Sequence, residues 1–400
     1  MVLRLGFIVN PVAGIGGPAA FKGSDERALE AADLGYLPSA PEKAGRFLRH
    51  LKELHRPMSI RIFAAPGVLG ADETRAAGWK VGTLGADMGL HDPFATDAEH
   101  TRQAAESAIG AEMDLLVFVG GDGTARDVAA TVGDAVPILG VPAGVKMFSE
   151  CFTETPEEAA LLVAGLARGF QEGDRLETAP AEVLDLDEEA YRAGRVEVRH
   201  HASAAIPRSP RIQSAKCPTC PQDGLEEAVG EVRLRMEEAP EGLYLIASGS
   251  TTAALKSVLG IDGTLIGVDA VTGTREGDKV RWQAVATDAD ATALERLVAD
   301  WKAKDAPAAL IVSPIGGQGF VVGRGTGQIT PNVLRAVLPD RLWPIATIGK
   351  LGTLEDGILH VDTGDPRLDR AFPDHLRVVV GLGRERMMRV RKSSPLPRTA

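Results

Sequence analysis

The stretch that decides the fold is LLVFVGGDGTARDVAATV, residues 115–132. Its first five residues are apolar and strand-sized, the next five form a glycine-rich turn, and the rest has the spacing of a helix. Gly120, Gly121 and Gly123 permit positive φ and let backbone N–H groups approach an anion. The N-terminus of the following helix adds partial positive charge. The stretch therefore predicts a buried parallel strand that ends in a phosphate-binding loop.

The alternation of apolar runs and helical periodicity extends over the first 145 or so residues, which is typical of a parallel sheet covered by helices. We therefore expect an α/β fold with a Rossmann-like N-terminal domain. The predicted strands are residues 3–9, 59–64, 115–119 and 136–141. The predicted helices are 41–54, 125–132 and one that runs from a capping box of Thr96 and Glu99 to about residue 109.

The pattern changes after residue 148, so we expect domains at 1–148 and 149–400. The second would be a mixed, β-rich α/β domain that completes a cleft, with a tail that can pack back on the first. It is expected to hold helices at 155–168 and from 289, and strand-like runs at 195–199, 229–236, 243–247, 309–312 and 378–382. Four prolines in residues 206–223 predict an excursion loop.

Bulk properties narrow the function classes. A length of 400 residues predicts two or three domains, at roughly 150 residues each. The net charge of −11 disfavours non-specific binding to nucleic acid or to an anionic membrane. Three cysteines cannot form a disulfide framework for a chain of this size, which favours a reducing compartment and a cytoplasmic location. The apolar runs are too short to span a bilayer, which requires about 20 residues.

Polar residues at predicted strand ends are the candidate site residues. Asp122, set among glycines beside the anion cradle, is best explained as a general base, although Asp122 or Thr124 could simply cap the helix. Asn10 and Pro11 end the first strand, and Lys146 follows the strand at 136–141, where open α/β sheets bind ligands. Lys146 is expected to contact phosphate, against the alternative of a solvated lysine.

Three motifs carry a family resemblance. GGDGT (residues 120–124) resembles the signature of the NAD kinase and diacylglycerol kinase superfamily, and FIVNPVAG (residues 7–14) resembles the Asn-Pro strand end beside its phosphate site. ASGSTTA (residues 247–253) is similar to the Thr-Gly-Ser-Thr-Ala segment of NAD kinases, which contributes to the dinucleotide pocket. The longer pattern resembles the ATP-NAD kinase-like and acetoin-catabolism protein X-like branch over nearly the whole chain. The segments that carry it are residues 22–25, 142–147, 264–269, 316–320 and 383–388.

This resemblance implies a kinase that uses ATP with Mg²⁺ and phosphorylates a hydroxyl, with NAD the leading acceptor. It implies that Asp122 is catalytic, and it implies two sets of binding residues. Phosphate would be bound by Asn10, Pro11, Gly120, Gly121, Gly123, Thr124 and Lys146, and substrate by Gly249, Ser250, Thr251 and Thr252, with Asp269, expected to end a strand, as a weaker candidate. Self-association is expected by resemblance only, and no metal ligand is assigned.

The chain departs from typical NAD kinases in one respect, because it has no clear Asn-Glu pair of the kind that holds the adenine ribose. Two alternatives therefore stay open: a kinase of a small diol or ketol metabolite, and a regulatory protein that binds NAD(P) without turnover. Polyphosphate also remains open as the donor. Hydrolase elbows, the Walker A loop and zinc-protease helices are absent from the sequence.

Three further features have a functional and a structural interpretation each. Cys217 and Cys220, near His200 and His201, have spacing compatible with zinc but are more simply surface thiols. The glycine-rich residues 316–327 are either a second anion loop or plain turns. The basic residues of the C-terminal region could contact phosphate or another subunit, or could be solvated; they are Arg384, Arg386, Arg389, Arg391 and Lys392.

Overall fold

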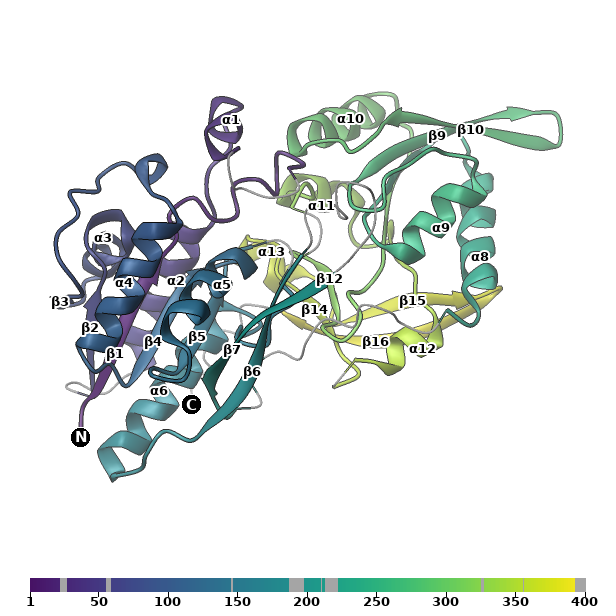
Figure 1. Ribbon diagram of the computed structural model, residues 1–400. Helices are drawn as coiled ribbons and strands as arrows, with labels where there is room; N and C mark the ends of the chain where they lie inside the picture. Colours follow the sequence, from purple (N-terminus) through teal and green to yellow (C-terminus); the bar gives the residue numbers. More distant parts are fainter. Residues whose placement is uncertain are drawn as a thin grey trace. The chain divides into compact units, whose positions relative to one another are not determined.

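The computed structural model describes residues 1–21, 27–54, 59–144, 147–186, 198–209, 211–212, 222–324, 327–354 and 356–392. The chain divides into two compact units, and most of their elements are labelled in Figure 1. The first unit comprises residues 1–16, 23–187 and 197–215, and the second comprises 17–22, 188–196 and 216–400.

The sheet of the first unit has five parallel strands in the order β3-β2-β1-β4-β5. The strands are β1 (Leu3–Val9), β2 (Ile60–Ala64), β3 (Val81–Thr83), β4 (Leu115–Gly120) and β5 (Ile138–Pro142). The Rossmann-like sheet predicted from the sequence is confirmed. The strand order reverses between β1 and β4, which is the topological switch point where open α/β sheets bind ligands.

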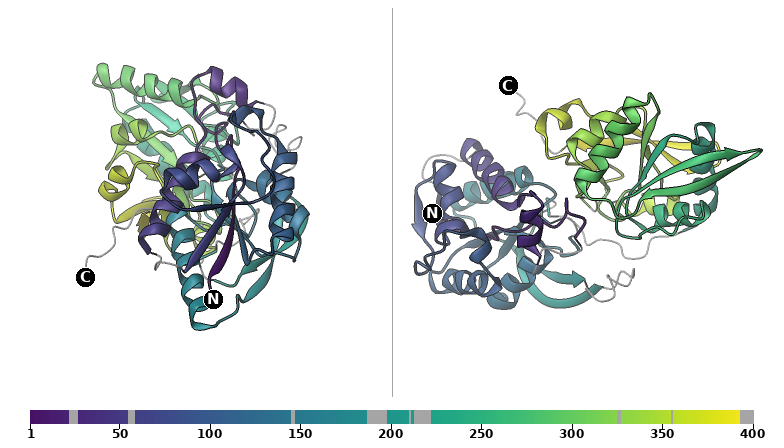
Figure 2. Two further views of the ribbon diagram at one scale, coloured as in Figure 1. Left: turned by 90° about the vertical axis from the view of Figure 1, so that its left-hand side faces the viewer. Right: turned by 90° about the horizontal axis from the view of Figure 1, so that it is seen from above.

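Helices cover both faces of this sheet (Figures 1 and 2). The helices of this unit are α1 (Ala28–Asp33), α2 (Ala40–Leu54), α3 (Ala71–Ala76), α4 (Ala98–Gly110), α5 (Asp122–Val132) and α6 (Pro156–Glu172), with 3₁₀ turns η1 (Gly67–Leu69) and η2 (Pro93–Ala95). Of these, α2 and α6 pack on one face of the sheet and α4 and α5 on the other. Leu5 and Phe7 of β1 share an apolar core with α2 and α6, whereas Ile8 belongs to the core under α4 and α5. Alternation along β1 thus supplies both cores.

The first unit continues past residue 148, where the sequence placed a boundary, and includes residues 149–187 and 197–215. Helix α6 buries Ala160 and Val163 in the core shared with α2. The antiparallel hairpin β6 (Thr178–Leu186) and β7 (Val198–Pro207) adds Val183 to the core under α4 and α5. Periodicity alone does not reveal this, because a strand's apolar face looks the same whichever core it covers.

Helix α4 begins one residue later than the sequence predicts. Its capping box is formed by Asp97, whose Oδ1 accepts a hydrogen bond from His100 N at 3.1 Å, while Asp97 N donates to His100 Nδ1 at 3.2 Å. The predicted box of Thr96 and Glu99 is wrong, because the Thr96 hydroxyl instead donates to Pro93 O and closes the preceding η2 turn.

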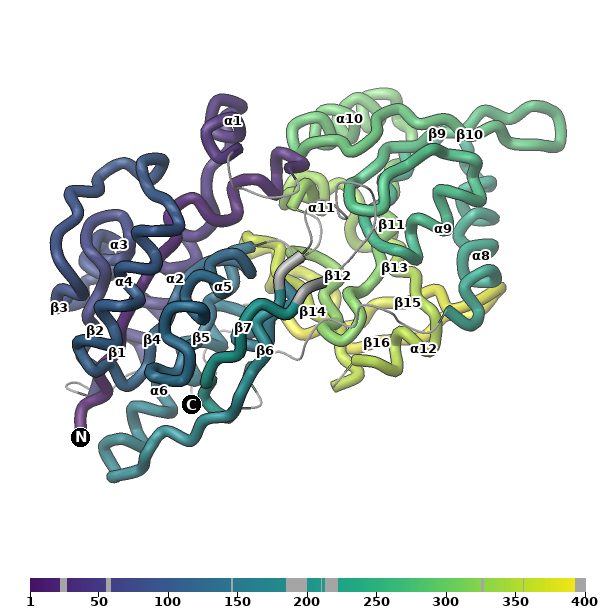
Figure 3. Tube along the Cα trace, viewed as in Figure 1, coloured from purple at the N-terminus to yellow at the C-terminus, as the bar shows by residue number. Residues whose placement is uncertain are grey.

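The second unit contains two mixed sheets, which confirms the expected β-rich α/β character. One sheet has the order β10-β9-β8-β11-β13, in which β8, β11 and β13 are parallel to one another, β9 is antiparallel to β8, and β10 is antiparallel to β9. The other sheet has the order β12-β14-β16-β15. The strands are β8 (Leu243–Ile246), β9 (Asp269–Glu276), β10 (Lys279–Ala286), β11 (Ala308–Val312), β12 (Phe320–Val322), β13 (Leu342–Pro344), β14 (Leu359–Val361), β15 (His375–Gly381) and β16 (Arg384–Lys392). The β9–β10 hairpin extends well beyond the sheet it starts from (Figure 3).

The helices of the second unit are α8 (Leu225–Glu238), α9 (Ser250–Val258), α10 (Ala291–Ala303), α11 (Pro331–Val337), α12 (Ile348–Gly352) and α13 (Pro366–Ala371). The strand-like run predicted at 229–236 is wrong, because it lies within α8. Val229, Val232 and Met236 are buried at helical spacing, so period 3.6 overrides the β-branched composition. Among the helices described, none is both long and apolar enough to cross a bilayer.

One carboxylate of the first unit makes stability depend on pH. Glu73 lies in the first turn of α3, and its Oε2 is buried without a hydrogen-bond partner in the described part of the chain. Burial raises the pKa of Glu73 from 4.5 to about 7. The folded state therefore holds this proton more tightly than the unfolded state, and stability is lost as pH rises from the unfolded pKa through the folded one.

We expect Glu73→Gln to be more stable than the parent at pH 8, by an amount approaching 3 kcal/mol, on the order of the pKa difference. The difference should shrink toward zero near pH 4, where the carboxyl is protonated in both states. Urea unfolding at the two pH values measures it. Glu106→Gln, on the exposed surface of α4, is the matched control. Equal pH dependence in parent and Glu73→Gln protein would contradict the assignment.

Candidate functional site

Two of the sequence motifs meet at the switch point of the first sheet. Strands β1 and β4 are paired in register, with Val9 opposite Val119. Asn10, directly after β1, donates from its backbone N to Val119 O at 3.0 Å. Its side chain Nδ2 donates to the Thr124 hydroxyl at 3.0 Å, across 114 residues of sequence. The Asn-Pro strand end and the glycine-rich loop are therefore one structural unit.

Helix α5 begins at Asp122, three residues before the predicted start at Ala125. Its N-cap is Gly121, whose lack of a side chain leaves the first turn without a side-chain cap. The alternative in which Asp122 or Thr124 supplies the N-cap is thus not what the structure shows. The N-terminus of an eleven-residue helix faces the carboxyl edge of the sheet with its amides uncapped by a side chain, as an anion site requires.

Gly120 is required for space, and none of the three glycines of the loop adopts the positive φ that the sequence permits. Gly120, Gly121 and Gly123 all have φ outside the left-handed region. A Cβ on Gly120 would lie 2.4 Å from Thr124 Oγ1, whereas a Cβ on Gly121 would meet backbone atoms of Gly144 no closer than 3.4 Å. Gly120 thus makes room for Thr124, and Gly121 leaves the backbone open.

Asp122 is held in a fixed position. Its side chain is 6% exposed; Oδ2 accepts a hydrogen bond from Phe148 N at 2.7 Å, and Oδ1 accepts from Ser149 N at 3.1 Å and Ser149 Oγ at 2.7 Å. Ser149 Oγ in turn accepts from Leu184 N at 3.0 Å and shares its one proton between Asp122 Oδ1 and Leu184 O, which ties the carboxylate to β6. Sequence reasoning missed Ser149, because nothing in the sequence links residue 149 to residue 122.

The end of β5 forms the third wall of this site. Ala143 N donates to Gly120 O at 2.9 Å, and Ala143 O accepts from Ser39 Oγ at 2.9 Å. Gly14 has φ +84°, and a Cβ there would lie 2.4 Å from Ala143 O, so only glycine fits between the Asn-Pro loop and β5. Pro11 is buried in the same loop. Lys146 lies outside the described residues.

The ASGSTTA segment forms a similar strand-to-helix turn in the second unit. It connects β8 to α9, whose N-cap Gly249 has φ +127° and provides no side-chain cap. Gly249 N donates to Leu265 O at 2.8 Å, and Thr252 Oγ1 donates to Gly249 O at 2.9 Å. Ser250 is exposed, whereas Thr251 and Thr252 are buried. Of the predicted substrate residues, Ser250 is thus the most accessible.

The sequence predicted that Asp269 ends a strand, but the structure places it at the start of β9. It is 0% exposed, and its carboxylate pairs with Lys256 Nζ at 2.8 Å and accepts from Thr264 N at 2.7 Å and Asp288 N at 2.8 Å. Burial lowers the pKa of Lys256, and the Asp269 charge opposes that shift. Asp269 therefore holds the loop that contacts Gly249 and presents no exposed oxygen to a ligand.

The remaining candidates fall into three groups. Cys217 and Cys220 lie outside the described residues, and the described residues contain no group of three His, Cys, Asp or Glu side chains suited to a metal. A Cβ on Gly319 or Gly323 would clash with a backbone oxygen of β14 or its flanks, at 2.6 and 1.9 Å, so packing explains these two glycines. The C-terminal basic residues lie on β16, where Lys392 pairs with Asp374 at 2.7 Å.

The glycine geometry predicts different outcomes for two neighbouring substitutions. Gly120→Ala should destabilise the first unit by about 1–3 kcal/mol, because the new methyl displaces Thr124 and its bond to Asn10. Gly121→Ala should fold with nearly the parent stability and instead weaken ATP binding, because the methyl crowds the approach to the amides. Urea unfolding and calorimetry measure the two effects. Equal loss of stability in both variants would contradict this distinction.

The Lys256–Asp269 pair predicts a large effect in the second unit. Asp269→Asn should cost about 3–5 kcal/mol of unfolding free energy, because it leaves a buried ammonium without its counter-charge. Asp262→Asn, on the exposed part of the same loop, is the control. The double variant Lys256→Met/Asp269→Leu should recover part of the loss. A small effect of Asp269→Asn in chemical unfolding would show that the pair is dispensable.

Two known protein-family models match the chain, one over each of its two strand-to-helix turns. The family model of the ATP-NAD kinase N-terminal domain matches residues 6–169, and that of the ATP-NAD kinase C-terminal domain matches residues 241–390. The first match contains Asn10, the GGDGT loop and Ser149, and the second contains the Gly249 turn and Asp269. A search of curated proteins gave no match. On the agreement of both family models with the fold and its two strand-end turns, the chain belongs to the ATP-NAD kinase family.

Proposed function

We propose that this protein transfers the γ-phosphoryl group of ATP to a hydroxyl of NAD and so forms NADP. The observation that carries the proposal is the site at the switch point of β1 and β4. There the helix N-terminus without a side-chain cap, the Asn10–Thr124 hydrogen bond and a fixed carboxylate lie together at one edge of the sheet. Membership of the ATP-NAD kinase family supports kinase chemistry with nucleotide substrates.

In this proposal the first turn of α5 binds phosphate. The amides of residues 121–124 point along the helix dipole, and glycine at 121 and 123 keeps the approach free of side chains. Asn10 positions Thr124 through its 3.0 Å hydrogen bond, and Pro11 is buried in the loop that follows β1. Lys146 would add a cation at the end of β5. Mg²⁺ bound with ATP would neutralise charge on the transferring phosphate, and no protein ligand is assigned to it.

Asp122 is the proposed general base. It would accept the proton of the acceptor hydroxyl as that oxygen attacks the γ-phosphorus and the bond to the ADP oxygen breaks. The hydrogen bonds from Phe148 and Ser149 fix the direction of its carboxylate. Positioning accounts for much of phosphoryl-transfer catalysis, so a rigid carboxylate is consistent with the role.

In the second unit, Gly249, Ser250, Thr251 and Thr252 are the proposed substrate segment. The turn begins α9, so its amides and the exposed Ser250 hydroxyl offer donors to a phosphate or ribose oxygen. Asp269 would not contact the substrate. It bonds to Thr264 N and Lys256 Nζ and so holds the loop whose Leu265 O accepts from Gly249 N. We also propose that the protein self-associates and acts in the cytoplasm.

The proposal predicts that Asp122→Asn lowers NADP formation by roughly 100-fold or more, the scale of a lost general base. The amide keeps one acceptor oxygen, so ATP affinity should stay within a few-fold of the parent value. Asp127→Asn is the matched control, since Asp127 is a second carboxylate on α5 and pairs with Arg102 at 3.3 Å. It should retain most of the activity.

The measurement is NADP formation by purified protein with NAD, ATP and Mg²⁺. Activity that survives Asp122→Asn would remove Asp122 from the mechanism. Parent protein that binds ATP but forms no NADP would favour a small diol or ketol acceptor, and replacing ATP with polyphosphate tests the donor. Tight NAD(P) binding without turnover of any acceptor would favour the regulatory alternative.

A further inference from the structure

A buried lysine lies at the carboxyl edge of the second unit's parallel strands. Strands β8, β11 and β13 are parallel neighbours, so their carboxyl ends share one edge of the sheet. Thr251 follows β8, Ser313 follows β11, and Lys350 follows β13. Lys350 Nζ donates to Ser313 Oγ at 2.8 Å and to Thr251 Oγ1 at 3.2 Å, so three strand ends converge on one ammonium group. Open sheets place ligands at this edge.

The position of Lys350 is fixed by its backbone. Thr347 is the N-cap of α12, and its hydroxyl accepts from Lys350 N at 3.0 Å. Lys350 is only 7% exposed. Burying an ammonium group costs free energy, because the group loses its hydration. Two of its acceptors, the Ser313 and Thr251 hydroxyls, are neutral, and the partly exposed Ser313 hydroxyl can rotate to donate to a ligand oxygen.

The first turn of α9 lies against this lysine. Thr251 belongs to that turn, the N-cap Gly249 offers no side-chain acceptor, and Ser250 is exposed. Ser248 and Ser313 are partly exposed, so the turn has a solvent-facing side. The Gly249 N to Leu265 O bond, supported by the Lys256–Asp269 pair, holds the turn in place.

We infer that Lys350 is a specificity residue that anchors a phosphate group of the nucleotide substrate at the α9 turn. Lys350 supplies the charge, the partly exposed Ser313 supplies a hydroxyl, and the first turn of α9 supplies amides and dipole, while the buried Thr251 hydroxyl positions the Lys350 ammonium group. Donors that converge from three strand ends match a tetrahedral oxyanion better than a planar carboxylate. The inference rests on the proposed function, because that function places substrate at residues 249–252.

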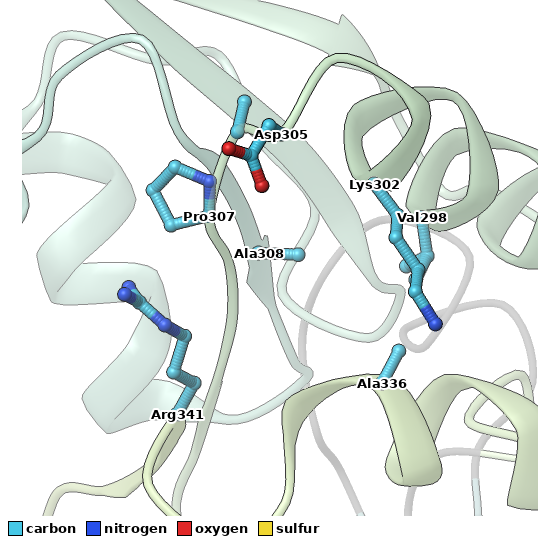
Figure 4. Close-up of a pocket in the computed structure, with 8 residues that line it drawn as sticks. Val298, Lys302, Asp305, Pro307, Ala308, Ala336 and Arg341 are labelled. Atoms are coloured by element: carbon cyan, nitrogen blue, oxygen red, sulfur yellow. The ribbon is translucent and has the colours of Figure 1, made fainter.

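The opposite edge of the same sheet provides an internal comparison. A pocket of about 290 Å³ lies at the amino ends of β11 and β13 and is lined by Lys302, Arg341 and Asp305, among others (Figure 4). Lys302 and Arg341 are both exposed, and the Asp305 carboxylate shares the pocket. Exposed cations beside a carboxylate offer an anion little beyond what solvent offers, so this pocket serves as the control.

The test compares Lys350→Met with Lys302→Met in the full chain. Calorimetry with inorganic pyrophosphate and with NAD measures binding, and acetate tests for a carboxylate preference. Lys350→Met should raise the Kd for pyrophosphate and NAD by about 10- to 100-fold, the effect of removing a charged hydrogen-bond donor. Ser313→Ala should raise both Kd values by several-fold, and Lys302→Met should leave them unchanged.

Three results would overturn the inference. They are unchanged binding in a folded Lys350→Met protein, a loss of binding in Lys302→Met, and stronger binding of acetate than of pyrophosphate. Should Lys350→Met fail to fold, Ser313→Ala decides, since it removes one hydroxyl and keeps the charge. The binding measurements are independent of turnover. NAD that binds through Lys350 without forming NADP would leave this inference standing and refute the proposed activity.

Discussion

The parallel pairing of β1 with β4 is the constraint on which the first site depends. Because parallel strands end at the same edge of a sheet, the residues after β1 and β4 must lie together, and Asn10 donates to both Val119 and Thr124 there. The pairing also sets the switch point, since β2 and β3 add on the far side of β1 whereas β5 adds on the far side of β4. Without this pairing, the glycine-rich turn would still begin a helix, but Asn10 would not lie beside it.

A second layer of constraint acts on the carboxylate. Asp122 lies in the first turn of α5, where a negative charge is favoured by the helix dipole but would repel a bound phosphate. The hydrogen bonds from Phe148 and Ser149 hold that charge to one side, and Ser149 is anchored on β6 through Leu184. Segments beyond the sheet thus determine where the carboxylate points.

The second unit repeats the same physical arrangement with different residues. A parallel strand, β8, leads through glycine into a helix, and a buried ion pair between Lys256 and Asp269 holds the adjoining loop. Lys350 occupies the edge position that no glycine-rich signature marks in the sequence. The family match over residues 241–390 includes all of these residues.

The sequence by itself determined the parallel sheet, its strand-to-helix turn at residues 120–124 and the family, because periodicity and glycine placement are local properties. It failed where tertiary packing decides. It took residues 229–236 for a strand and gave no sign of Ser149 or Lys350. Those features depend on contacts between residues tens of positions apart, so only the folded chain brings their hydrogen-bond partners within reach.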